Sequence, residues 1–591
     1  MPVCRFEIPE CPAAAVERLQ RELRVSGPLA QVLVRRGFAE PELARVFLAG
    51  VEEHPPEAFR GIGEAVAVIL RHVAQGTRIT VHGDYDVDGV CSTAVLVRAL
   101  RELGGDVDFY LPDRSSDGYG LNLGTVERLA ARGTQLLVTV DCAVTAVEEV
   151  AAAYTLGMEV VVTDHHSPRA DGALPRAPIV HPRLCDYPCV DLCATAVAYK
   201  LAEALYVARG RDPRDLRQDL DLVALATVAD VVALTGENRT LVRRGLRALA
   251  GSAKPGLRAL MAVARVDPAN VDERALGFAL APRLNAAGRL YRADAGLELI
   301  LTSDAKRAAE IAKELDSANH ERRQLERRIR FEAEAQMAEL GERSAYVLAG
   351  EGWHPGVIGI VASRMVELSG RPVVMIALED DTGRGSGRSI ESFDLLAGLT
   401  ACSGSLLGYG GHRAAAGLQI ERARVGDFAA ALCAHADETL RPDDLVPVER
   451  VDAIVDGEDL GMALAEELQT LAPFGRGNPA VSLMLADAVF LDSRPMGEGK
   501  HVRFSVESGG TRARAVAFGC GGRLAVADGE PVRATFALEV NEWNGVSEPR
   551  LVLRRAIAQA AEPAQDDPVQ AEEDIGSEEL EAGELVLFAL P

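Results

Sequence analysis

Apolar positions follow a helical period over the first 55 residues of the chain. Apolar side chains recur three and four positions apart in the segments 13–25, 28–37 and 41–49. This spacing places the apolar side chains on one face of each segment when it is helical. We therefore predict three short amphipathic helices that pack on a larger body.

The pattern changes from residue 78 onward to short apolar runs that end in polar residues. The runs cover 78–86, 106–113, 135–141, 158–166 and 220–230, and segments with helical spacing lie between most of them. Alternating strand and helix patterns predict a parallel sheet with helices on both faces. Because binding sites in such sheets form at the carboxyl ends of the strands, the polar residues that end these runs are candidates for one shared site.

The second half of the chain predicts a long helix and two further domains. Residues 304–340 contain neither Gly nor Pro and carry dense charges of alternating sign, which is typical of one long helix that joins two lobes. Residues 344–440 combine strand and helix patterns and predict a second α/β lobe. Several short strand patterns between 448 and 557 predict a small OB-like β-barrel.

Composition and charge restrict the class of protein. The chain has 591 residues, of which 48% are hydrophobic and 26% charged, so several folded domains are expected. No run approaches the roughly 20 apolar residues of a membrane span. Ten cysteines are too few for a disulfide scaffold and the amino terminus lacks a secretory signal, so we expect a cytoplasmic protein that is not attached to a membrane.

The net charge of −25 argues at first against a nucleic-acid partner. Residues 560–591, however, contain ten acidic and no basic side chains, so much of this charge lies in a tail that we expect to be disordered. Local fields decide where a polyanion binds, and a site that gathers metal ions is itself rich in carboxylates. The overall charge therefore does not exclude a nucleic-acid substrate.

The strongest motif is VHGDYDVDGV, which places Asp84, Asp86 and Asp88 directly after the first predicted strand. Alternate carboxylates in an extended segment point to the same side, and the flanking glycines permit a tight turn. A calcium loop is the alternative. The template of such a loop requires a Glu at the twelfth position, where this chain has Val95. A calcium-binding loop also follows a helix, whereas this segment follows a predicted strand. We therefore interpret the motif as part of a different metal site.

Three further motifs carry carboxylates or imidazoles. LLVTVDCAV ends one predicted strand with Asp141, and VVVTDHHSP ends another with Asp164, His165 and His166. ALATVADVV sets Asp230 in an apolar stretch, where a buried carboxylate is costly unless it is paired or binds a metal ion. Each motif alone also fits a helix cap or an ordinary hydrogen bond. Together they predict one metal-binding cluster.

The donor set indicates the chemistry. Carboxylate and imidazole together suit Mn²⁺ or Mg²⁺, and the absence of thiolates from the candidate ligands argues against structural zinc. Cys185, Cys189 and Cys193 lie elsewhere at a four-residue spacing that lacks the C-x₂-C form of common zinc sites. Two divalent cations about 3.5–4 Å apart can activate water and stabilise an in-line displacement at phosphorus. We therefore predict hydrolysis of a phosphoester.

The motifs GDYDVDG, VTVD, TDHH and TVADVV resemble, in this order, those of the DHH phosphoesterase superfamily. Further segments resemble the RecJ-type exonucleases, which are specific for single-stranded DNA and directed to its 5′ end. These segments are LPDRSSDGYGL, PRLNAAGR, LDSANHERR, WHPGVIGIVASR, GSGRSI, GYGGHRAAAGL and PFGRGNP. The sequence pattern and the resemblance together predict the following domains: an N-terminal helical segment (1–55), a DHH catalytic domain (56–300), a connecting helix (301–343), a DHH-associated substrate-binding domain (344–445), an OB-like domain that binds nucleic acid (446–558) and an acidic tail (559–591). The four domains from 56 to 558 are those that the resemblance implies.

The resemblance also implies roles for the motif residues. The implied ligands of two Mn²⁺ or Mg²⁺ ions are Asp84, Asp86, Asp88, Asp141, His165 and Asp230. Asp141 is expected to bridge the two ions, and Asp88, Asp141 and His166 are the expected catalytic residues. His166 is similar to the histidine of the family that faces the substrate, and Asp164 is expected to orient an imidazole.

One ligand remains a choice between two residues. Some branches of the superfamily use a histidine four residues before the second aspartate of the first motif, and His82 occupies that place. His82 therefore competes with Asp84, which the resemblance favours as a further ligand or as a group that orients another ligand.

The second lobe and three arginines are expected to hold the nucleotide. In the glycine-rich segments GSGRS and GYGGH, backbone N–H groups can approach a phosphate closely. The implied substrate-binding residues are Ser386, Arg388, Gly410, Gly411 and His412, with Arg114, Arg283 and Arg289 for a 5′-terminal phosphate. A guanidinium suits an end group because it binds two oxygens at once. The alternative for each arginine is a surface or interdomain salt bridge.

These observations predict a metal-dependent exonuclease that releases mononucleotides from single-stranded DNA in the 5′ to 3′ direction, in recombination and repair. Single-stranded DNA is the expected partner, with a single-strand-binding protein and a helicase as further candidates. One alternative is a phosphodiesterase of the same superfamily that acts on short oligonucleotides or cyclic dinucleotides. Another is a catalytically inactive scaffold that binds DNA. The predicted barrel favours a long substrate, and the filled ligand positions argue against an inactive scaffold.

Overall fold

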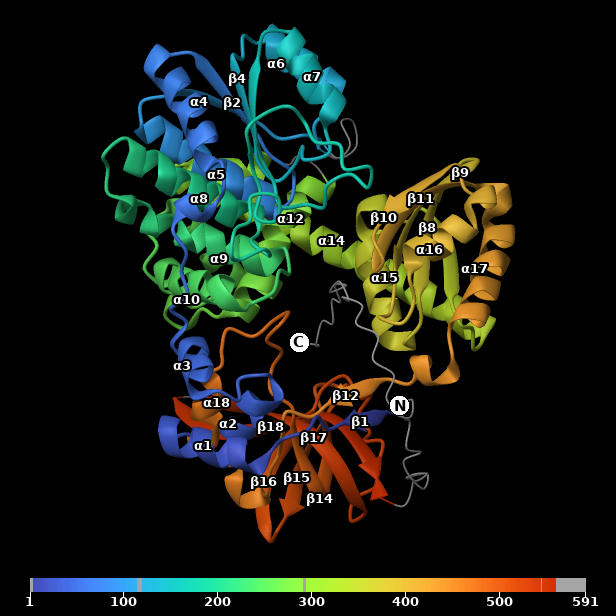
Figure 1. Ribbon diagram of the computed structural model, residues 1–591. Helices are drawn as coiled ribbons and strands as arrows, with labels where there is room; N and C mark the ends of the chain where they lie inside the picture. Colours follow the sequence, from blue (N-terminus) through green and yellow to red (C-terminus); the bar gives the residue numbers. More distant parts are fainter. Residues whose placement is uncertain (1–3, 114–119, 291–293, 544, 560–591) are drawn as a thin grey trace, which may run out of the picture.

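Two α/β lobes and a β-barrel form the molecule, at the top, right and bottom of Figure 1. The computed structural model describes residues 4–113, 120–290, 294–543 and 545–559. The predicted Arg114 contact and the acidic tail beyond residue 559 lie outside the described residues. The predicted fold class, a parallel-sheet lobe, a long helix, a second α/β lobe and an OB-like barrel, is confirmed.

The first lobe is built on a five-stranded sheet in which every pair of neighbouring strands is parallel. The strand order is β3-β2-β4-β5-β6, so β2, β4 and β5 lie side by side in its middle. The strands are β2 (Arg78–His82), β3 (Asp106–Tyr110), β4 (Leu136–Thr139), β5 (Glu159–Thr163) and β6 (Ile179–Val180).

Helices cover both faces of this sheet, which is why its central strands have continuous apolar sequences. Leu136 and Val138 of β4 pack in the core beneath α4, α5 and α8, whereas Leu137 packs in the core beneath α6 and α7. The five helices are α4 (Ile62–Gln75), α5 (Val87–Glu102), α6 (Leu123–Ala131), α7 (Val147–Thr155) and α8 (Ala194–Ala208).

One predicted strand is a helix. The apolar run at 220–230 forms α9 (Leu220–Ala229), and Asp230 follows the last turn of this helix instead of ending a strand. The strand prediction was wrong because residues from Leu220 to Thr227 are all buried. A helix buried on all sides lacks a polar face, so its sequence cannot be distinguished from that of a buried strand by periodicity.

The remaining helices of the first lobe lead into the predicted long helix. They are α10 (Gly236–Ala250), α11 (Pro255–Ala264), a π-helical turn (Ala275–Leu280), α12 (Ala281–Leu290) and α13 (Asp294–Leu301). The long helix is α14 (Ala305–Leu340), 36 residues in length. Its first turn is capped by Asp304, whose carboxylate accepts hydrogen bonds from the N–H groups of Lys306 and Arg307.

The second lobe contains a five-stranded sheet of order β10-β11-β9-β8-β7, in which only β7 and β8 run parallel. Helix α15 packs on one face together with α14, and α16 and α17 pack on the other. The elements are β7 (Tyr346–Glu351), α15 (Pro355–Ser369), β8 (Val373–Glu379), β9 (Thr382–Arg388), α16 (Leu395–Ala401), β10 (Gly408–Gly411), β11 (Ala415–Glu421) and α17 (Val425–Thr439).

The barrel is closed because β14 pairs both with β15 and with β17. Its strand order is β13-β14-β15-β16-β18-β17. The elements are β13 (Ala453–Ile454), α18 (Met462–Gln469), β14 (Leu483–Met496), β15 (His501–Ser508), β16 (Thr511–Ala517), β17 (Pro531–Trp543) and β18 (Val546–Ala558).

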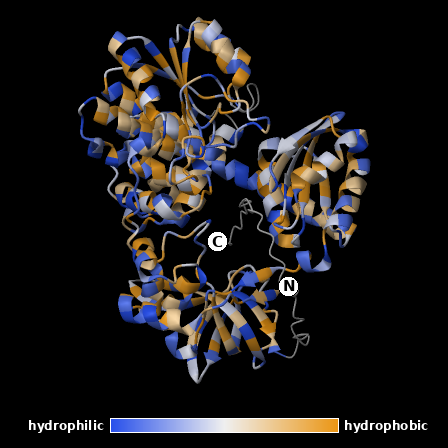
Figure 2. Cartoon of the chain, in the orientation of Figure 1, coloured by the Kyte–Doolittle hydropathy of each residue, from blue (hydrophilic) through white to orange (hydrophobic). Residues whose placement is uncertain are grey.

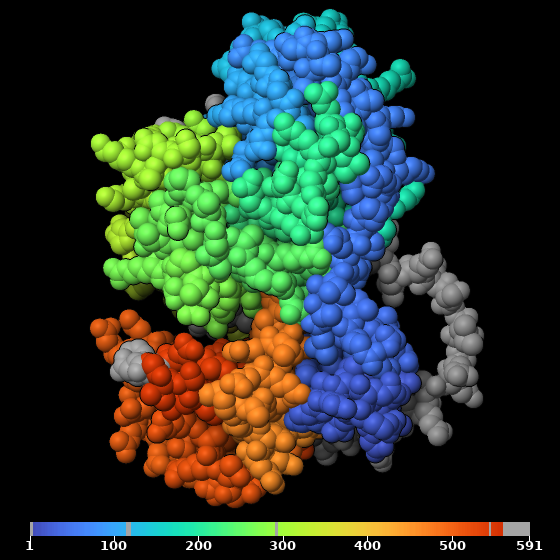
Figure 3. Space-filling view, turned by 90° about the vertical axis from the view of Figure 1, so that its left-hand side faces the viewer, coloured from blue at the N-terminus to red at the C-terminus, as the bar shows by residue number. Residues whose placement is uncertain are grey.

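The three predicted N-terminal helices pack on this barrel. Leu19, Leu29 and Phe47 share a core with Phe490 and Phe536 of the barrel strands. The helices are α1 (Ala13–Leu23), α2 (Gly27–Arg35) and α3 (Pro41–Ala49), and β1 (Arg5–Glu7) pairs with β12 (Val448–Arg450). In Figure 3 this segment, in blue, runs along both the barrel and the first lobe.

Figure 2 shows hydrophobic positions, in orange, on the helices and strands of all three bodies, and buried apolar side chains form a core in each of them. Among the described residues, the helices lack an apolar stretch of the length needed to cross a membrane.

Candidate two-metal active site

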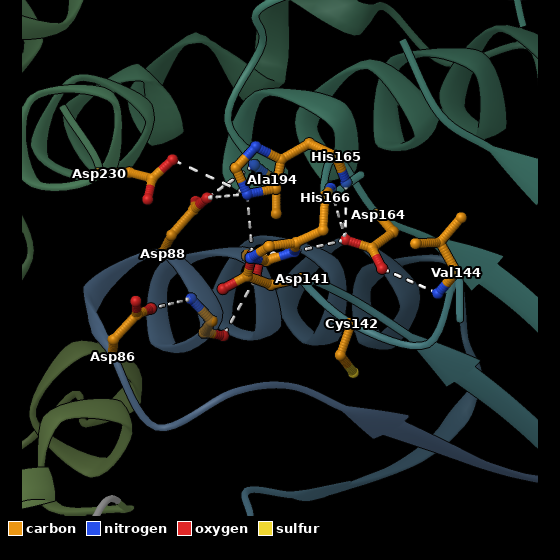
Figure 4. Close-up of polar contacts among 12 residues, drawn as sticks. Asp86, Asp88, Asp141, Cys142, Val144, Asp164, His165, His166, Ala194 and Asp230 are labelled. Atoms are coloured by element: carbon orange, nitrogen blue, oxygen red, sulfur yellow. Dashed lines mark hydrogen bonds and ion pairs between the residues drawn. The ribbon is translucent and has the colours of Figure 1, made fainter. Parts of the chain in front are cut away.

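The predicted motif residues meet at one edge of the first sheet (Figure 4). Strands β2, β4 and β5 are neighbours, with His82 paired to Thr139 and Thr139 paired to Val162. The loops after these three strands therefore leave the same edge. They bring the aspartates of the first motif, Asp141 and the His165–His166 pair together, and Asp230 joins them from the end of α9.

The turn after β2 is fixed by close packing against α5. Asp86 caps α5 by accepting a hydrogen bond from the Gly89 N–H at 3.0 Å. A Cβ atom on Gly83 would lie 2.1 Å from Thr93 Oγ1, and one on Gly89 would lie 2.4 Å from the Asp84 nitrogen. The two glycines are therefore needed because the backbone approaches α5 closely, not because the turn requires a positive φ.

Asp88 lies in the first turn of α5 and holds the beginning of α8. Its two carboxylate oxygens accept hydrogen bonds from the N–H groups of Ala194 at 2.7 Å and Thr195 at 2.8 Å. The Thr195 hydroxyl donates a third hydrogen bond at 2.6 Å. Asp88 Oδ2 also lies 3.7 Å from His165 Nε2.

Asp141 is the buried centre of the cluster. Its φ of +62° turns the chain directly after β4, and its Oδ1 lies 3.2 Å from His165 Nε2. Burial, together with the charges of Asp88, Asp86 and further aspartates, raises the pKa of the Asp141 carboxyl well above its usual range. Burial and the neighbouring Asp88 likewise raise the pKa of Asp86.

Asp164 holds the backbone of both histidines and orients the imidazole of His166. Its Oδ1 accepts hydrogen bonds from the backbone N–H groups of His165 and His166, and the His166 Nδ1–H donates to the same oxygen at 2.8 Å. Its Oδ2 accepts the Val144 N–H at 2.9 Å. Burial opposes both charges, but the hydrogen bond between them prevails: it lowers the pKa of Asp164 to about 2 and raises the pKa of His166 to about 9.

The last predicted ligand, Asp230, faces the same imidazole. Its Oδ2 lies 3.7 Å from His165 Nε2, and burial is the main cause that lowers the pKa of His165. A neutral imidazole offers a ring nitrogen to a cation. Asp230 reaches this place from a helix end, so the predicted residue is present but its predicted strand is not.

The side chains form three overlapping groups of possible metal ligands. In each group the ligand atoms lie within 4.8 Å of one another. Asp141 belongs to two groups and His165 to two, which is the arrangement expected if neighbouring cations share ligands. The groups are Asp84–Asp86–Asp141, Asp141–His165–His166 and Asp88–His165–Asp230.

The residues present fit divalent cations. Asp141 Oδ1 and His165 Nε2 are both buried and lack a hydrogen-bond partner within the described chain. Buried polar atoms without partners are costly, and the raised pKa of Asp141 shows that its negative charge lacks compensation from the protein. Oxygen-rich donors with one or two imidazoles are the ligand chemistry of Mn²⁺ and Mg²⁺.

The choice between His82 and Asp84 follows from the same geometry. His82 is fully buried, its Nδ1 lies 3.5 Å from Cys142 Sγ, and its ring stacks on Tyr110. Asp84 contributes an atom to one of the three ligand groups, and His82 contributes to none of them. The geometry therefore favours Asp84 as the additional ligand.

Models of three domain families match successive parts of the chain. The N-terminal domain of the DHH family matches residues 78–227, the DHHA1 domain matches 342–439 and the RecJ OB domain matches 451–555. The single-stranded-DNA-specific exonuclease RecJ of Bacillus subtilis is 36% identical over 93% of this chain and 70% of its own length. The chain belongs to the RecJ family. The resemblance inferred from the motifs is thereby confirmed.

Other members of the RecJ family are also similar to this chain over most of its length. The RecJ exonuclease of Escherichia coli is 37% identical over 83% of this chain and 89% of its own length. The crystal structure of RecJ from Thermus thermophilus in complex with Mn²⁺ superposes with a TM-score of 0.82 and 32% identity, over 94% of this chain and 79% of that one. A second structure of that protein contains Mg²⁺ and has a TM-score of 0.76 at 31% identity, over 93% of this chain and 78% of that one.

The predicted phosphate-binding arginines have different surroundings. Arg283 donates to Asp316 Oδ1 at 2.9 Å and to the Ala279 carbonyl at 2.6 Å, so its guanidinium joins α12 to α14. The contact with Asp316 is the kind of salt bridge expected under the alternative, and phosphate binding by Arg283 stays a prediction. Arg289 donates to the Gly356 carbonyl at 3.0 Å and thus links α12 to the first turn of α15.

The other predicted substrate residues lie on the sheet of the second lobe. Ser386 and Arg388 are on β9, where Arg388 donates to the Ser386 hydroxyl at 3.1 Å. Gly410 and Gly411 are on the edge strand β10, and the exposed His412 follows them. Strand β11 separates β9 from β10, so these residues share one sheet but belong to two separate segments of it.

Two supporting residues of the site were not predicted. Buried His181 accepts the N–H groups of Arg183 and Leu184 at its Nδ1, so the proton is on Nε2, which donates to the His166 carbonyl at 2.8 Å. Asn285 Oδ1 accepts the Val87 N–H at 3.1 Å and supports the start of α5. The PRLNAAGR motif contained Asn285, but no sequence feature indicated its partner.

The three cysteines at four-residue spacing make other contacts. Cys185 Sγ donates to the Ile179 carbonyl, and Cys193 Sγ lies 3.4 Å from Thr227 Oγ1. All three are free thiols, and none of them belongs to a possible metal-binding group within the described ranges.

The raised pKa values predict that metal binding depends on pH. In the metal-free folded protein, Asp86 and Asp141 keep protons at pH values where the unfolded chain has lost them, so they contribute stability at low pH that disappears as pH rises. A cation must displace these protons. We expect the affinity for Mn²⁺ to fall about tenfold for each pH unit by which the pH is lowered below the pKa of these carboxyls, for each proton displaced. Calorimetry in buffers of different ionisation enthalpy measures the protons released; release of none would contradict the prediction.

Proposed function

We propose that the chain is an exonuclease that hydrolyses single-stranded DNA from the 5′ end to mononucleotides. The observation that carries this proposal is the convergence of Asp86, Asp88, Asp141, His165 and Asp230 on one buried site in a member of the RecJ family. Curated relatives of this chain have the name single-stranded-DNA-specific exonuclease. The proposed cofactors are two ions of Mn²⁺ or Mg²⁺, the cations found in the Thermus thermophilus structures.

The chain's own residues determine where the reaction takes place. Bound cations would supply the activated water and compensate the charge that develops on the phosphoryl oxygens. Asp164 holds the His166 ring through Nδ1, and in the metal-free protein this hydrogen bond and the charge of Asp164 raise the pKa of His166 to about 9. We propose that His166 contacts the scissile phosphate and donates a proton toward the leaving oxygen.

A chain of contacts connects the metal-binding turn to the second lobe. Helix α12 touches the turn at Gly288, where a Cβ atom would lie 2.7 Å from the Tyr85 carbonyl, and its Arg289 reaches Gly356 of α15. On α15, a Cβ atom at Gly359 would lie 2.8 Å from Ser386 Oγ. These contacts support the proposal that Ser386, Arg388 and the segment Gly410–His412 hold the terminal nucleotide beside the cations.

Direction and strand specificity are further parts of the proposal. Arg114, which lies outside the described residues, and Arg289 are proposed to bind a 5′-terminal phosphate. The closed barrel supports a polymeric substrate, because a dinucleotide does not require a second binding domain. We further propose a role in recombination and repair in the cytoplasm, with a single-strand-binding protein and a helicase as the partners that deliver free single-stranded ends.

Product analysis tests the proposed function. Purified protein with Mn²⁺ is incubated with single strands labelled at either end, with a blunt duplex and with a dinucleotide. We expect a strand labelled at its 5′ end to release labelled mononucleotide at once, and a strand labelled at its 3′ end to shorten progressively. Internal cleavage, equal hydrolysis of the duplex or a preference for the dinucleotide would refute it.

A further inference from the structure

Asp230 is followed by a strained residue. Val231 has a φ of +57°, and the left-handed region is strongly disfavoured for a β-branched side chain. Such a conformation persists only when the surroundings hold it in place. The residues that fix segment 232–235 therefore also determine where the Asp230 carboxylate lies.

The loop at residues 473–479, which we call the PFGRGNP loop, lies against this segment. The Leu234 N–H donates to the Arg476 carbonyl at 2.8 Å. A Cβ atom at Gly477, whose φ is +72°, would lie 3.2 Å from both Ala233 Cβ and Thr235 Cγ2. Figure 1 shows an orange loop near α18 that rises from the barrel to the first lobe. The sequence motif PFGRGNP thus contacts the chain three to five residues after Asp230.

The PFGRGNP loop is itself rigid. Gly475 and Asn478 exchange two backbone hydrogen bonds of 2.9 and 3.1 Å. The side chain of Asn478, 1% exposed, donates to the carbonyls of Leu471 and Pro473 and accepts a hydrogen bond from Arg36 at 2.7 Å. Arg36 in turn forms a salt bridge with Asp452. The loop is therefore fastened to both the barrel and the N-terminal helices.

Two further contacts fasten the loop region to the first lobe. Buried Glu273 accepts the Phe474 N–H at 2.9 Å. Arg239 of α10 is 1% exposed and donates to the carbonyls of Thr470 and Leu471, just before the loop, while its guanidinium lies 4.3 Å from the centre of the Phe47 ring. The barrel and the N-terminal helices are thus docked on the first lobe within a few residues of Asp230.

We propose that the PFGRGNP loop is a positioning element for Asp230, so that docking of the barrel completes the cation site formed by Asp88, His165 and Asp230. This proposal rests on the proposed two-metal hydrolysis. It assigns the barrel a role in cation binding in addition to DNA binding. Residues 473–479 touch neither cation nor DNA in this role; they act by holding segment 232–235 and, through strained Val231, the last ligand.

Gly477→Ala tests the proposal in the full-length protein. The added methyl group contacts Ala233 and Thr235 and should displace the segment that carries Asp230. We expect Mn²⁺ binding at one of two sites, measured by calorimetry, to weaken about 10–100-fold, as is typical when a residue supporting a metal ligand is changed. The kcat for single-stranded DNA should fall and recover at high Mn²⁺, while KM for DNA should stay unchanged.

Gly529→Ala is the matched control. Gly529 is also in the barrel and also has a positive φ, +87°, but a Cβ atom there would meet nothing within 4 Å. It carries a similar backbone strain without touching the first lobe, so Mn²⁺ affinity should equal that of the wild type. Equal loss of Mn²⁺ affinity in the two variants would overturn the proposal.

A second substitution distinguishes positioning from general damage to the fold. Thr235→Ser removes the Cγ2 atom that the new methyl group would meet, and it keeps the hydroxyl at the start of α10. The double variant G477A/T235S should therefore regain part of the lost Mn²⁺ affinity. If the double variant regains no Mn²⁺ affinity, the proposal is overturned. It is also overturned if Gly477→Ala binds Mn²⁺ as tightly as the wild type and only its KM for DNA rises. If the wild-type protein does not hydrolyse DNA, the proposed function is refuted. If Gly477→Ala nevertheless binds Mn²⁺ more weakly than that wild type, the positioning role is still supported.

Discussion

Asp141→Asn is expected to lower the rate of hydrolysis of single-stranded DNA by roughly 10⁴-fold, the scale of losing one essential catalytic group. Asp141 takes part in two of the three ligand groups, so its charge is the one that both cations share in our proposal. Asparagine is isosteric and tolerates the φ of +62° that alanine would disfavour. The substitution thus removes the charge with little change in backbone strain. Single-turnover kinetics at saturating DNA measure the effect.

The same substitution should not weaken the fold of the metal-free protein. Burial and neighbouring carboxylates raise the pKa of Asp141, so at neutral pH the folded state loses stability through this carboxyl, either by burying its charge or by holding a proton that the unfolded chain releases. The midpoint of thermal unfolding in the presence of a chelator should therefore rise or stay constant in Asp141→Asn. Asp106→Asn serves as the control, because Asp106 is exposed at the opposite, amino-terminal end of β3. Substantial hydrolysis by Asp141→Asn would refute a shared ligand at this position.

Most of the fold follows from periodicity, and the exception has a physical cause. Strands β2, β4 and β5 are buried on both faces, so continuous apolar runs with polar ends identify them and the edge where they end. Helix α9 has an equally apolar sequence, but only tertiary packing determines that it is a helix. The sequence also did not show where the N-terminal helices pack, because an amphipathic face does not identify the barrel as the surface that it contacts.

The site was predictable as a set of residue types but not as a network. Four motifs contain the carboxylates and histidines that the structure brings together. Three of these motifs follow parallel strands that end at one edge, whereas Asp230 comes from the end of helix α9. Contacts between distant segments could not be predicted. His181, directly after β6, supports His166 in the loop that follows β5, and the Leu234–Arg476 hydrogen bond joins positions more than 200 residues apart. Arg283 is a further example: no sequence feature indicated its salt bridge with Asp316.

Asp88→Ala is expected to abolish hydrolysis and, unlike Asp141→Asn, to destabilise the protein. The Asp88 carboxylate is both a proposed cation ligand and the acceptor for three buried donors, the N–H groups of Ala194 and Thr195 and the Thr195 hydroxyl. Removing it leaves these donors without an acceptor at the start of α8. We expect the free energy of unfolding to fall by about 3 kcal/mol. Urea unfolding in the presence of a chelator measures this loss without any contribution from bound cations.

Asp88→Asn separates the two roles of this side chain. The amide keeps one carbonyl oxygen, so it can still accept a hydrogen bond from the start of α8, but its NH₂ group faces a donor and it lacks the charge that a cation requires. We expect its stability to lie between those of the wild type and Asp88→Ala, and its hydrolysis to be as low as that of Asp88→Ala. If Asp88→Ala is as stable as the wild type, the hydrogen bonds from Asp88 to α8 contribute little to stability. If Asp88→Asn hydrolyses DNA appreciably, Asp88 is not a cation ligand.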